Sequence, residues 1–305
     1  MVNHINLKKA KNIFFKGIFR VCGLLAGSMI LIIVGFIVVK GVSVFLPSYG
    51  PDFVNFKDFI TGFTWQADQG KYGVLFIVIN TLLSSFFAIL LAFPISVLTA
   101  LFIVKVAPDW LASIMQTVIE LLAAIPSVVY GVFASGIIVL FVDWLAMSLG
   151  YSTFGGRSLL SVVILLAIMI LPTMTTLSIT AIASVSKDLE QASLALGASP
   201  TQTNFKVILI SAKSGIFAGL ILGLSRALGE ATAVSMVAGN RAFGPTFNPF
   251  DITRTLTSTM LSGMSETTGA DYDIRFSVGI VLIILILISN MLIHAVKRKV
   301  GNHES

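Results

Sequence analysis

The sequence predicts an all-α integral membrane protein with six transmembrane helices, and three observations lead to this fold class. Of the 305 residues, 56% are hydrophobic and only 11% are charged, whereas a soluble globular domain carries roughly 25% charged residues. The apolar residues fall into six runs long enough for the roughly 20 residues that a helix needs to cross a bilayer. The runs are continuous rather than alternating every second residue, which argues against a transmembrane barrel.

The six predicted spans cover residues 21–46, 73–104, 111–141, 158–184, 214–238 and 276–296. The first is longer than the apolar core of a signal peptide, so we expect it to be retained as a helix. Pro94 and Pro126 lie inside the second and third spans, and proline removes a helical hydrogen bond. We therefore expect bent or interrupted helices at these two positions.

The basic residues predict the orientation, because cytoplasmic loops are enriched in lysine and arginine. Six spans place both termini on one side, which makes residues 1–20 a cytoplasmic basic segment and 297–305 a cytoplasmic tail. Twelve basic residues lie on this side: Lys8, Lys9, Lys11, Lys16, Arg20, Lys105, Lys187, Lys206, Lys213, Lys297, Arg298 and Lys299. Seven are spread over longer outer loops: Lys40, Lys57, Lys71, Arg157, Arg241, Arg254 and Arg275. The net charge of +6 is thus explained by orientation, without nucleic acid as a partner.

Arg226 is the remaining basic residue, and it lies with Glu230 inside the fifth span. Charges inside a membrane are costly and mark functional sites. The i, i+4 spacing predicts that the two side chains face each other on one helix. They share a face with Gly215, Gly219 and Gly223, a pattern typical of close helix packing. The pair is compatible with a substrate path or with a structural ion pair.

Other polar residues are candidates for the same path. Thr173, Thr176, Thr180 and Ser184 share one face of the fourth span and would either line a hydrated path or bond to their own helix backbone. Glu120 in the third span is either a buried charge or lies near the inner interface. The sequence contains no nucleotide-binding motif of the type G-x-x-x-x-G-K-[ST], no nucleophile paired with a histidine, and no metal-ligand cluster. We therefore expect no enzymatic activity, cofactor or metal.

The inner loop at 185–213 is long and polar. Ser186-Lys187-Asp188 is typical of a helix start, and Gly197 to Pro200 of a break, so two short helices around a glycine turn are predicted. Such a helical hairpin would dock onto a soluble partner or serve only as a connector.

This loop resembles the EAA loop of ABC importer permeases. Its pattern is E-A-A, three residues, G, nine residues, then I-x-L-P, and Gln191, Ala192 and Ser193 stand at the E-A-A positions. The remaining matches are Gly197, Val207 and Leu209. Gln191 replaces the usual acid and Ile210 the usual proline, which puts in doubt the salt bridge expected from the acid to the ATPase.

Two further stretches narrow the resemblance to phosphate importer permeases of the PstC type. They are Glu120-Leu-Leu-Ala-Ala-Ile-Pro-Ser-Val-Val-Tyr-Gly131 and Leu224-Ser-Arg-Ala-Leu-Gly-Glu-Ala-Thr-Ala-Val-Ser-Met-Val-Ala-Gly-Asn240. The resemblance implies a type I ABC importer permease fold over residues 73–296, with the hairpin as coupling element, and a place in the bacterial cell membrane. The implied partners are a PstA-like permease, two ABC ATPase subunits, an extracytoplasmic phosphate-binding protein and membrane lipid.

Three alternatives remain open at this point. The chain could be a molybdate or sulfate permease of the same class. It could also be a secondary transporter or channel that works alone, although its two halves show no repeat. The third alternative is a membrane sensor or scaffold that transports nothing.

Overall fold

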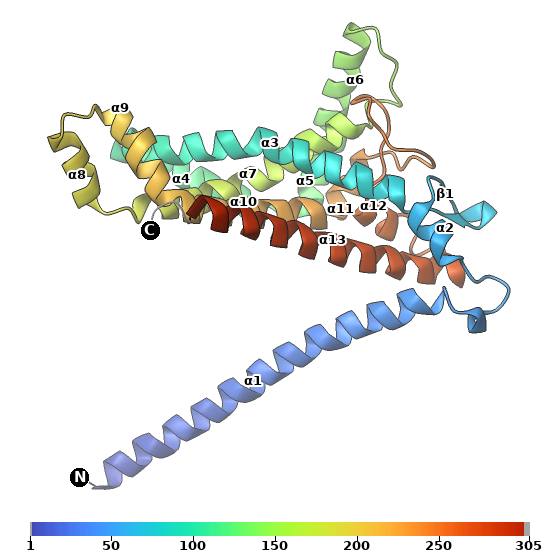
Figure 1. The fold of residues 1–305 in the computed structure, drawn as a ribbon, viewed down its shortest axis with the longest axis horizontal. Helices are drawn as coiled ribbons and strands as arrows, with labels where there is room; N and C mark the ends of the chain where they lie inside the picture. Colours follow the sequence, from blue (N-terminus) through green and yellow to red (C-terminus); the bar gives the residue numbers. More distant parts are fainter. Residues whose placement is uncertain (1, 302–305) are drawn as a thin grey trace.

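The protein is a bundle of long helices with a pair of short strands and several short helices at one end (Figure 1). The computed structural model describes residues 2–301, with the side chains of residues 11–295. The predicted basic residues Lys8, Lys9, Lys297, Arg298 and Lys299, and the end of the tail 297–305, therefore lie outside the described side chains. The α-helices are α1 Val2–Ser43, α2 Phe56–Thr61, α3 Leu75–Lys105, α4 Asp109–Ala124, α5 Ser127–Phe133, α6 Val139–Ser148, α7 Leu159–Ala183, α8 Lys187–Ala195, α9 Pro200–Thr203, α10 Leu209–Gly229, α11 Thr232–Val237, α12 Leu256–Leu261 and α13 Ala270–Gly301.

Smaller elements complete the chain. Two strands, β1 Trp65–Gln66 and β2 Lys71–Tyr72, pair antiparallel with Trp65 opposite Tyr72. Two turns of π-helix, Ala134–Ile138 and Asn204–Ile208, join α5 to α6 and α9 to α10, and 3-10 turns form at Pro47–Tyr49 and Ala67–Gln69.

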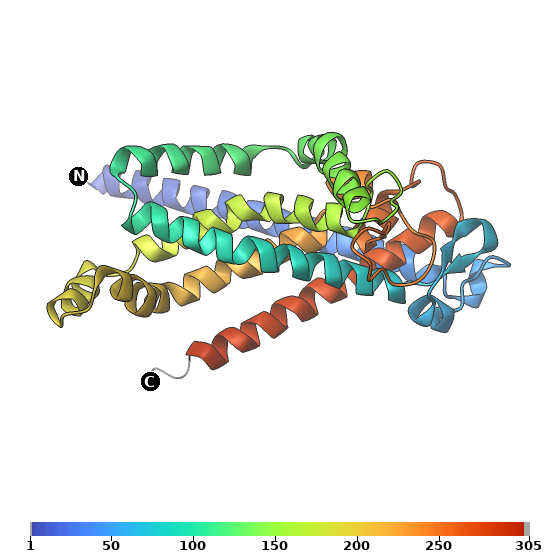
Figure 2. The same cartoon turned by 90° about the horizontal axis from the view of Figure 1, so that it is seen from above.

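Six segments of the described chain are long and apolar enough to cross a membrane, as predicted: Lys11–Ser43, Leu75–Lys105, Ser127–Ser148, Leu159–Ala183, Pro200–Gly229 and Ala270–Ala295. The helix α7 is the centre of the bundle, because 61% of its most apolar stretch is buried inside the chain. It packs against α3 and α10 along most of their length (Figure 2). Its buried side chains, among them Leu165, Leu166 and Met174, form the core with Ala88 and Ala92 of α3.

The predicted third span, 111–141, is interrupted at Pro126, as expected from the proline, whereas Pro94 lies inside α3 without ending that helix. Ile125 and Pro126 are extended and separate α4 from α5, because a proline lacks the amide for a helical bond and forces the residue before it out of the helical region. The spanning segment is Ser127–Ser148 instead.

The predicted fifth span, 214–238, is also interrupted. Glu230 has an extended backbone, with φ −75° and ψ 114°, and ends α10. The spanning helix is therefore Pro200–Gly229, and the short α11 packs separately against α5. At this contact a Cβ on Gly131 would come within 2.9 Å of the Ala233 Cα atom, so only glycine fits there.

The predicted glycine stripe allows α10 to approach α7 closely. A Cβ on Gly215 would lie 2.4 Å from the Ala181 Cβ, and one on Gly223 would lie 2.7 Å from the Met174 Sδ. A Cβ on Gly219 would lie 3.3 Å from the Leu177 Cβ and 3.4 Å from the Met174 carbonyl oxygen. The stripe therefore faces protein, as small residues at helix contacts in membranes commonly do.

The helix α1 touches the bundle only near its C-terminal end and diverges from it toward the N-terminus (Figure 1). Lys40 forms an ion pair of 3.2 Å with Asp273 of α13, and Ser277 Oγ donates to the Gly41 carbonyl at 2.6 Å. No residue from 11 to 33 in its apolar stretch is buried. Most of the side-chain surface of α1 therefore has no contact within the described chain.

The two ends of the bundle differ in character. We call the end with α8 and α9 the hairpin end and the end with β1, β2, α2 and α12 the loop end. The N-terminal end of α1 and the C-terminal end of α13 lie toward the hairpin end (Figure 1).

Candidate functional site

Arg226 lies in the last turn of α10 and reaches across to α7. Its Nη1 donates to the Thr173 hydroxyl at 2.8 Å, and Tyr130 of α5 lies nearby. The side chain is half-buried and forms no ion pair with another described residue. Its other donors are free of protein partners among the described residues. Arg226 thus presents a positive charge where α5, α7 and α10 meet.

The predicted pairing of Arg226 with Glu230 is wrong. The helix ends before Glu230, so the two side chains no longer follow the i, i+4 geometry. One Glu230 carboxylate oxygen accepts the amide hydrogen of Ala233 at 3.1 Å, which satisfies a free amide at the start of α11. The Glu230 carbonyl accepts from the Thr257 hydroxyl at 2.7 Å. Glu230 therefore holds the break between α10 and α11.

The hydroxyl stripe of α7 begins at the arginine and runs toward the hairpin end. Thr176, Thr180 and Ser184 are exposed, and Thr173 is half-buried. Thr176 and Thr180 each donate to the carbonyl four residues before them, at 3.0 Å. The structure thus confirms the bonds to the helix backbone for Thr176 and Thr180, whereas the path along this stripe stays a prediction.

The six residues predicted to couple the chain to an ATPase fall into two groups. Gln191, Ala192 and Gly197 are exposed on the α8–α9 hairpin, and Gly197 adopts a left-handed conformation, with φ +87°, in its turn. Ser193 is half-buried and bonds to the Thr203 hydroxyl at 2.9 Å. The other two lie beyond the hairpin: Val207 in the π-helical turn, and Leu209 packed on the cluster that contains Ile182, Ile208 and Ala212.

The hairpin presents apolar side chains to its surroundings. Leu196 is 90% exposed at the turn, and Leu189 and Leu194 are also exposed. An ion pair of 2.5 Å between Lys105 and Glu190 ties α8 to the end of α3. Glu190, the acid next to the E-A-A position, is thus engaged within the chain.

Two arginines at the loop end, the half-buried Arg254 and the buried Arg275, were not singled out as site residues. Arg254 donates to the carbonyls of Arg241 and Asn240 at 2.6 and 2.8 Å, and Arg275 donates to those of Thr259, Ser262 and Asp271. Neither forms an ion pair with a described carboxylate. Burial, with a smaller contribution from Arg275, lowers the pKa of Arg254 to about 10, so it stays charged at neutral pH. Sequence hydropathy carries no signal for such contacts, because loop arginines are usually solvated.

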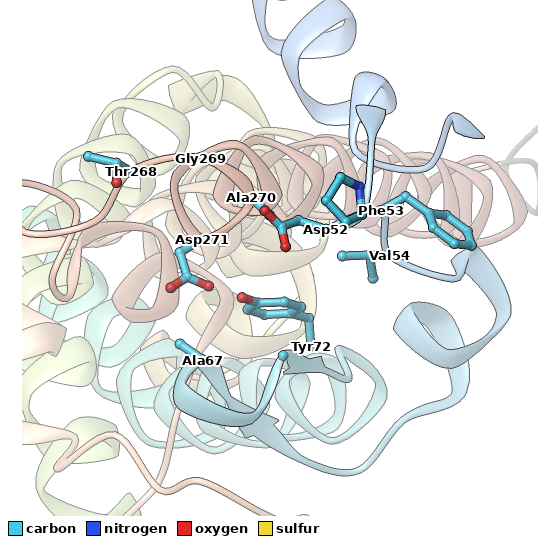
Figure 3. A pocket seen from close by; sticks show the side chains of 11 residues that line it. Asp52, Phe53, Val54, Ala67, Tyr72, Thr268, Gly269, Ala270 and Asp271 are labelled. Carbon is cyan, nitrogen blue, oxygen red and sulfur yellow. The ribbon is translucent and has the colours of Figure 1, made fainter. Parts of the chain in front are cut away.

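A hollow of about 540 Å³ opens at the loop end between the segment after α1 and the start of α13. Figure 3 shows the carboxylates of Asp52 and Asp271 around the Tyr72 ring. Among the described residues, no lysine or arginine lines this hollow. Two carboxylates facing the same space repel an anion, so this space suits an anionic ligand poorly.

Comparison with known proteins identifies relatives over most of the chain. Residues 92–302 match the family described as "binding-protein-dependent transport system inner membrane component". The chain is 36% identical to the probable ABC transporter permease protein YqgH of Bacillus subtilis, with 89% of this chain and 86% of that protein covered. It is 32% identical to the phosphate transport system permease protein PstC of Pasteurella multocida, with 81% and 84% covered.

Solved structures share the fold at lower identity. A bacterial ABC transporter involved in the import of the acidic polysaccharide alginate superposes with a TM-score of 0.61 at 17% identity, covering 91% of this chain and 96% of that one. The inward-facing MetNI methionine ABC transporter gives 0.54 at 20% identity, covering 75% and 94%.

Proposed function

Because the chain belongs to the family of binding-protein-dependent transport system inner membrane components, we propose that it is the permease subunit of an ATP-driven importer of inorganic phosphate. The chain is a multi-pass membrane protein and an ABC importer permease, not an enzyme in itself. The proposal adds the substrate and the assembly. In it, the chain forms the translocation path together with a PstA-like permease.

Arg226 is the observation that carries the substrate proposal. A phosphate crossing a poorly hydrated path needs a compensating positive charge, and the planar guanidinium suits oxyanions. The bond to Thr173 uses one Nη1 hydrogen, which leaves further donors for a phosphate oxygen. Thr173, Thr176 and Thr180 would continue the path toward the hairpin end, and Glu230 would keep the arginine in place by fixing the end of α10. The PstC relatives support phosphate among the possible oxyanions.

The remaining partners in the proposal follow from the energy source. The sequence has no nucleotide-binding motif, so two ABC ATPase subunits would bind at Gln191, Ala192 and the exposed leucines of the hairpin. An extracytoplasmic phosphate-binding protein would deliver the substrate at the loop end. Both termini would then be cytoplasmic, in a bacterial cell membrane, because they lie at the hairpin end (Figure 1).

Uptake of labelled phosphate tests the proposal. Cells that lack the gene, with and without a plasmid copy, are assayed in the presence of excess sulfate or molybdate. We expect restored phosphate uptake that neither competitor reduces and that ATP depletion abolishes. Restored uptake of sulfate or molybdate instead would assign the chain to another oxyanion, and uptake that survives ATP depletion would indicate a stand-alone transporter.

Substitution of Arg226 tests the path. Arg226→Gln is expected to lower phosphate uptake at least tenfold, equivalent to about 1.4 kcal/mol, while the assembled complex is still recovered. Arg157→Gln is the matched control, because Arg157 is exposed in a loop. Equal uptake by the two variants would remove Arg226 from the path.

A further inference from the structure

The helix α4 has three distinct faces. Directions around the helix are given at 100° per residue, with Ile119 at zero. The residues that pack against the bundle have a mean direction of about −30°. They are Leu111, Ala112, Met115, Ile119 and Leu122, which are buried or half-buried. The rest of α4 is exposed within the described chain, so its surroundings must be deduced from its side chains.

The exposed surface divides into an apolar and a polar face. Trp110, Ile114, Val118 and Leu121 are between 48% and 66% exposed and centre near −145°, which suits lipid. Ser113, Gln116, Thr117 and Glu120 are also exposed and centre near 110°. The two faces point about 100° apart, so the polar face meets different surroundings from the apolar one.

Glu120 is the charged member of the polar face, and we place it within the thickness of the membrane because α4 packs beside the spanning helices α3 and α7. It follows the start of α4 at Asp109 by about 16 Å of helix rise, roughly half of the 30 Å hydrocarbon thickness. The helix starts at the hairpin end, close to Lys105, and runs alongside the bundle (Figure 2). A carboxylate at this depth requires water or a cation next to it.

No such cation is present among the described residues. Thr117 already donates to the Ser113 carbonyl at 2.9 Å, whereas Glu120 has no ion pair or hydrogen bond to another described side chain. Water alone would leave the carboxylate unpaired on a helix that packs beside spanning helices, where an unpaired charge is costly. A basic side chain from outside the chain would supply the missing partner.

We propose that the polar face of α4 is a contact surface for the second permease, and that Glu120 pairs there with a lysine or arginine of that subunit. This inference rests on the proposed function only in requiring a second permease. It does not depend on the substrate. The ion pair would neutralise Glu120, and the apolar face of α4 would remain in lipid.

Photo-crosslinking in the purified complex tests the surface. A benzoyl-phenylalanine is placed at position 117 on the polar face or, as the matched control, at position 121 on the apolar face. We expect position 117 to crosslink to the second permease and position 121 to react with lipid only. Adducts from 117 with lipid alone, or with another copy of this chain, would overturn the proposal.

Suppressor genetics tests the charge. Glu120→Lys is expected to lower recovery of the second permease with this chain at least tenfold, and Glu120→Gln less, because repulsion exceeds the loss of an attraction. Suppressors of Glu120→Lys that restore recovery should replace a basic residue in the second permease by an acidic one. Suppressors confined to this chain would contradict the proposal. Neither readout measures transport, so a sulfate importer would still give the crosslink while failing the phosphate assay.

Discussion

At the scale of single residues, the charges inside the bundle have different tasks. Arg226 is held by one neutral hydroxyl, and no carboxylate among the described residues forms an ion pair with it. Glu230 instead supports the start of α11. An ion pair between them would have weakened any attraction of Arg226 for an anion, so the helix break keeps the arginine available.

Removal of the Thr173 hydroxyl tests how Arg226 is positioned. Thr173→Val keeps the shape of the side chain but removes the hydroxyl that accepts the hydrogen bond. A hydrogen bond from a charged donor is worth about 1 to 3 kcal/mol. We expect a severalfold rise in the phosphate concentration that gives half-maximal uptake. Thr61→Val is the control, because its hydroxyl bonds only to its own helix α2 among the described residues and lies outside the proposed path. Equal effects in the two variants would argue against a positioning role.

Tyr49 links alkaline pH to the attachment of α1. Its hydroxyl donates to Asp273 at 3.0 Å, and burial together with this bond raises its pKa to about 12. Because the pKa of the Tyr49 hydroxyl is raised in the fold, its protonated form stabilises the folded chain fully at pH values below its ordinary pKa of 10.0. This stabilisation is lost as the pH rises toward 12.

The corresponding measurement is thermal unfolding in detergent. Between about pH 9 and about pH 11, the unfolding temperature of the natural chain should fall more than that of Tyr49→Phe, which cannot ionise. Parallel decreases in the two proteins would rule out Tyr49 as the source.

At the scale of elements, interrupted helices and the hairpin define how parts can move. The short α5 and α11 pack on each other at Gly131 and Ala233. Each of them begins just after a break, at Pro126 and at Glu230 respectively. On the other side, Pro200–Gly229 forms one spanning segment from the hairpin to the arginine. A force on the hairpin would therefore reach Arg226 without crossing a loop.

The ion pair between Lys105 and Glu190 is predicted to transmit force from the hairpin to α3. Lys105→Glu or Glu190→Lys alone should reduce uptake per ATP hydrolysed by roughly tenfold, about 1.4 kcal/mol, and the double exchange should restore most of it. The ratio is measured in proteoliposomes with the full complex. Failure of the double exchange to restore coupling, with assembly intact, would show that the pair is not the link.

The glycine stripe sets the α7–α10 contact. Gly215→Val places side-chain atoms on Ala181, where a Cβ alone comes within 2.4 Å, so we expect a loss of about 1 to 3 kcal/mol from overpacking. Gly136→Val is the control, because nothing lies within 4 Å of a Cβ there. Folded yield after detergent extraction distinguishes them, and similar yields would contradict this packing.

At the scale of the whole molecule, the sequence predicted the six spans but not every helix end. Long apolar runs identify spanning segments because lipid demands them. The break at Pro126 carried a local signal in the proline. The break at Glu230 did not, because the Thr257 hydroxyl and the Ala233 amide that hold it belong to other elements. For the same reason, the partner of Arg226 was predicted as Glu230 but proved to be Thr173 of α7.

The diverging α1 predicts that the chain buries more surface in its complex than alone. Cys22, the single cysteine, is exposed on this helix, so a small maleimide reports on it directly. We expect labelling in detergent to slow severalfold when the second permease is present, because a packed thiol reacts more slowly. Equal labelling rates with and without that subunit would place this part of α1 in lipid alone.

The length of the segment Pro200–Gly229 means that a small tilt near one end moves its other end by a larger distance. Its π-helical turn at Asn204–Ile208 lies close to the hairpin, and π turns inside helices are frequent at functional sites. Arg226 stands about 27 Å beyond this turn, so a tilt of about 5° would displace it by roughly 2 Å. That displacement exceeds the distance tolerance of a hydrogen bond. A small rotation at the hairpin would thus be amplified enough to release Arg226 from Thr173 and offer it to an anion.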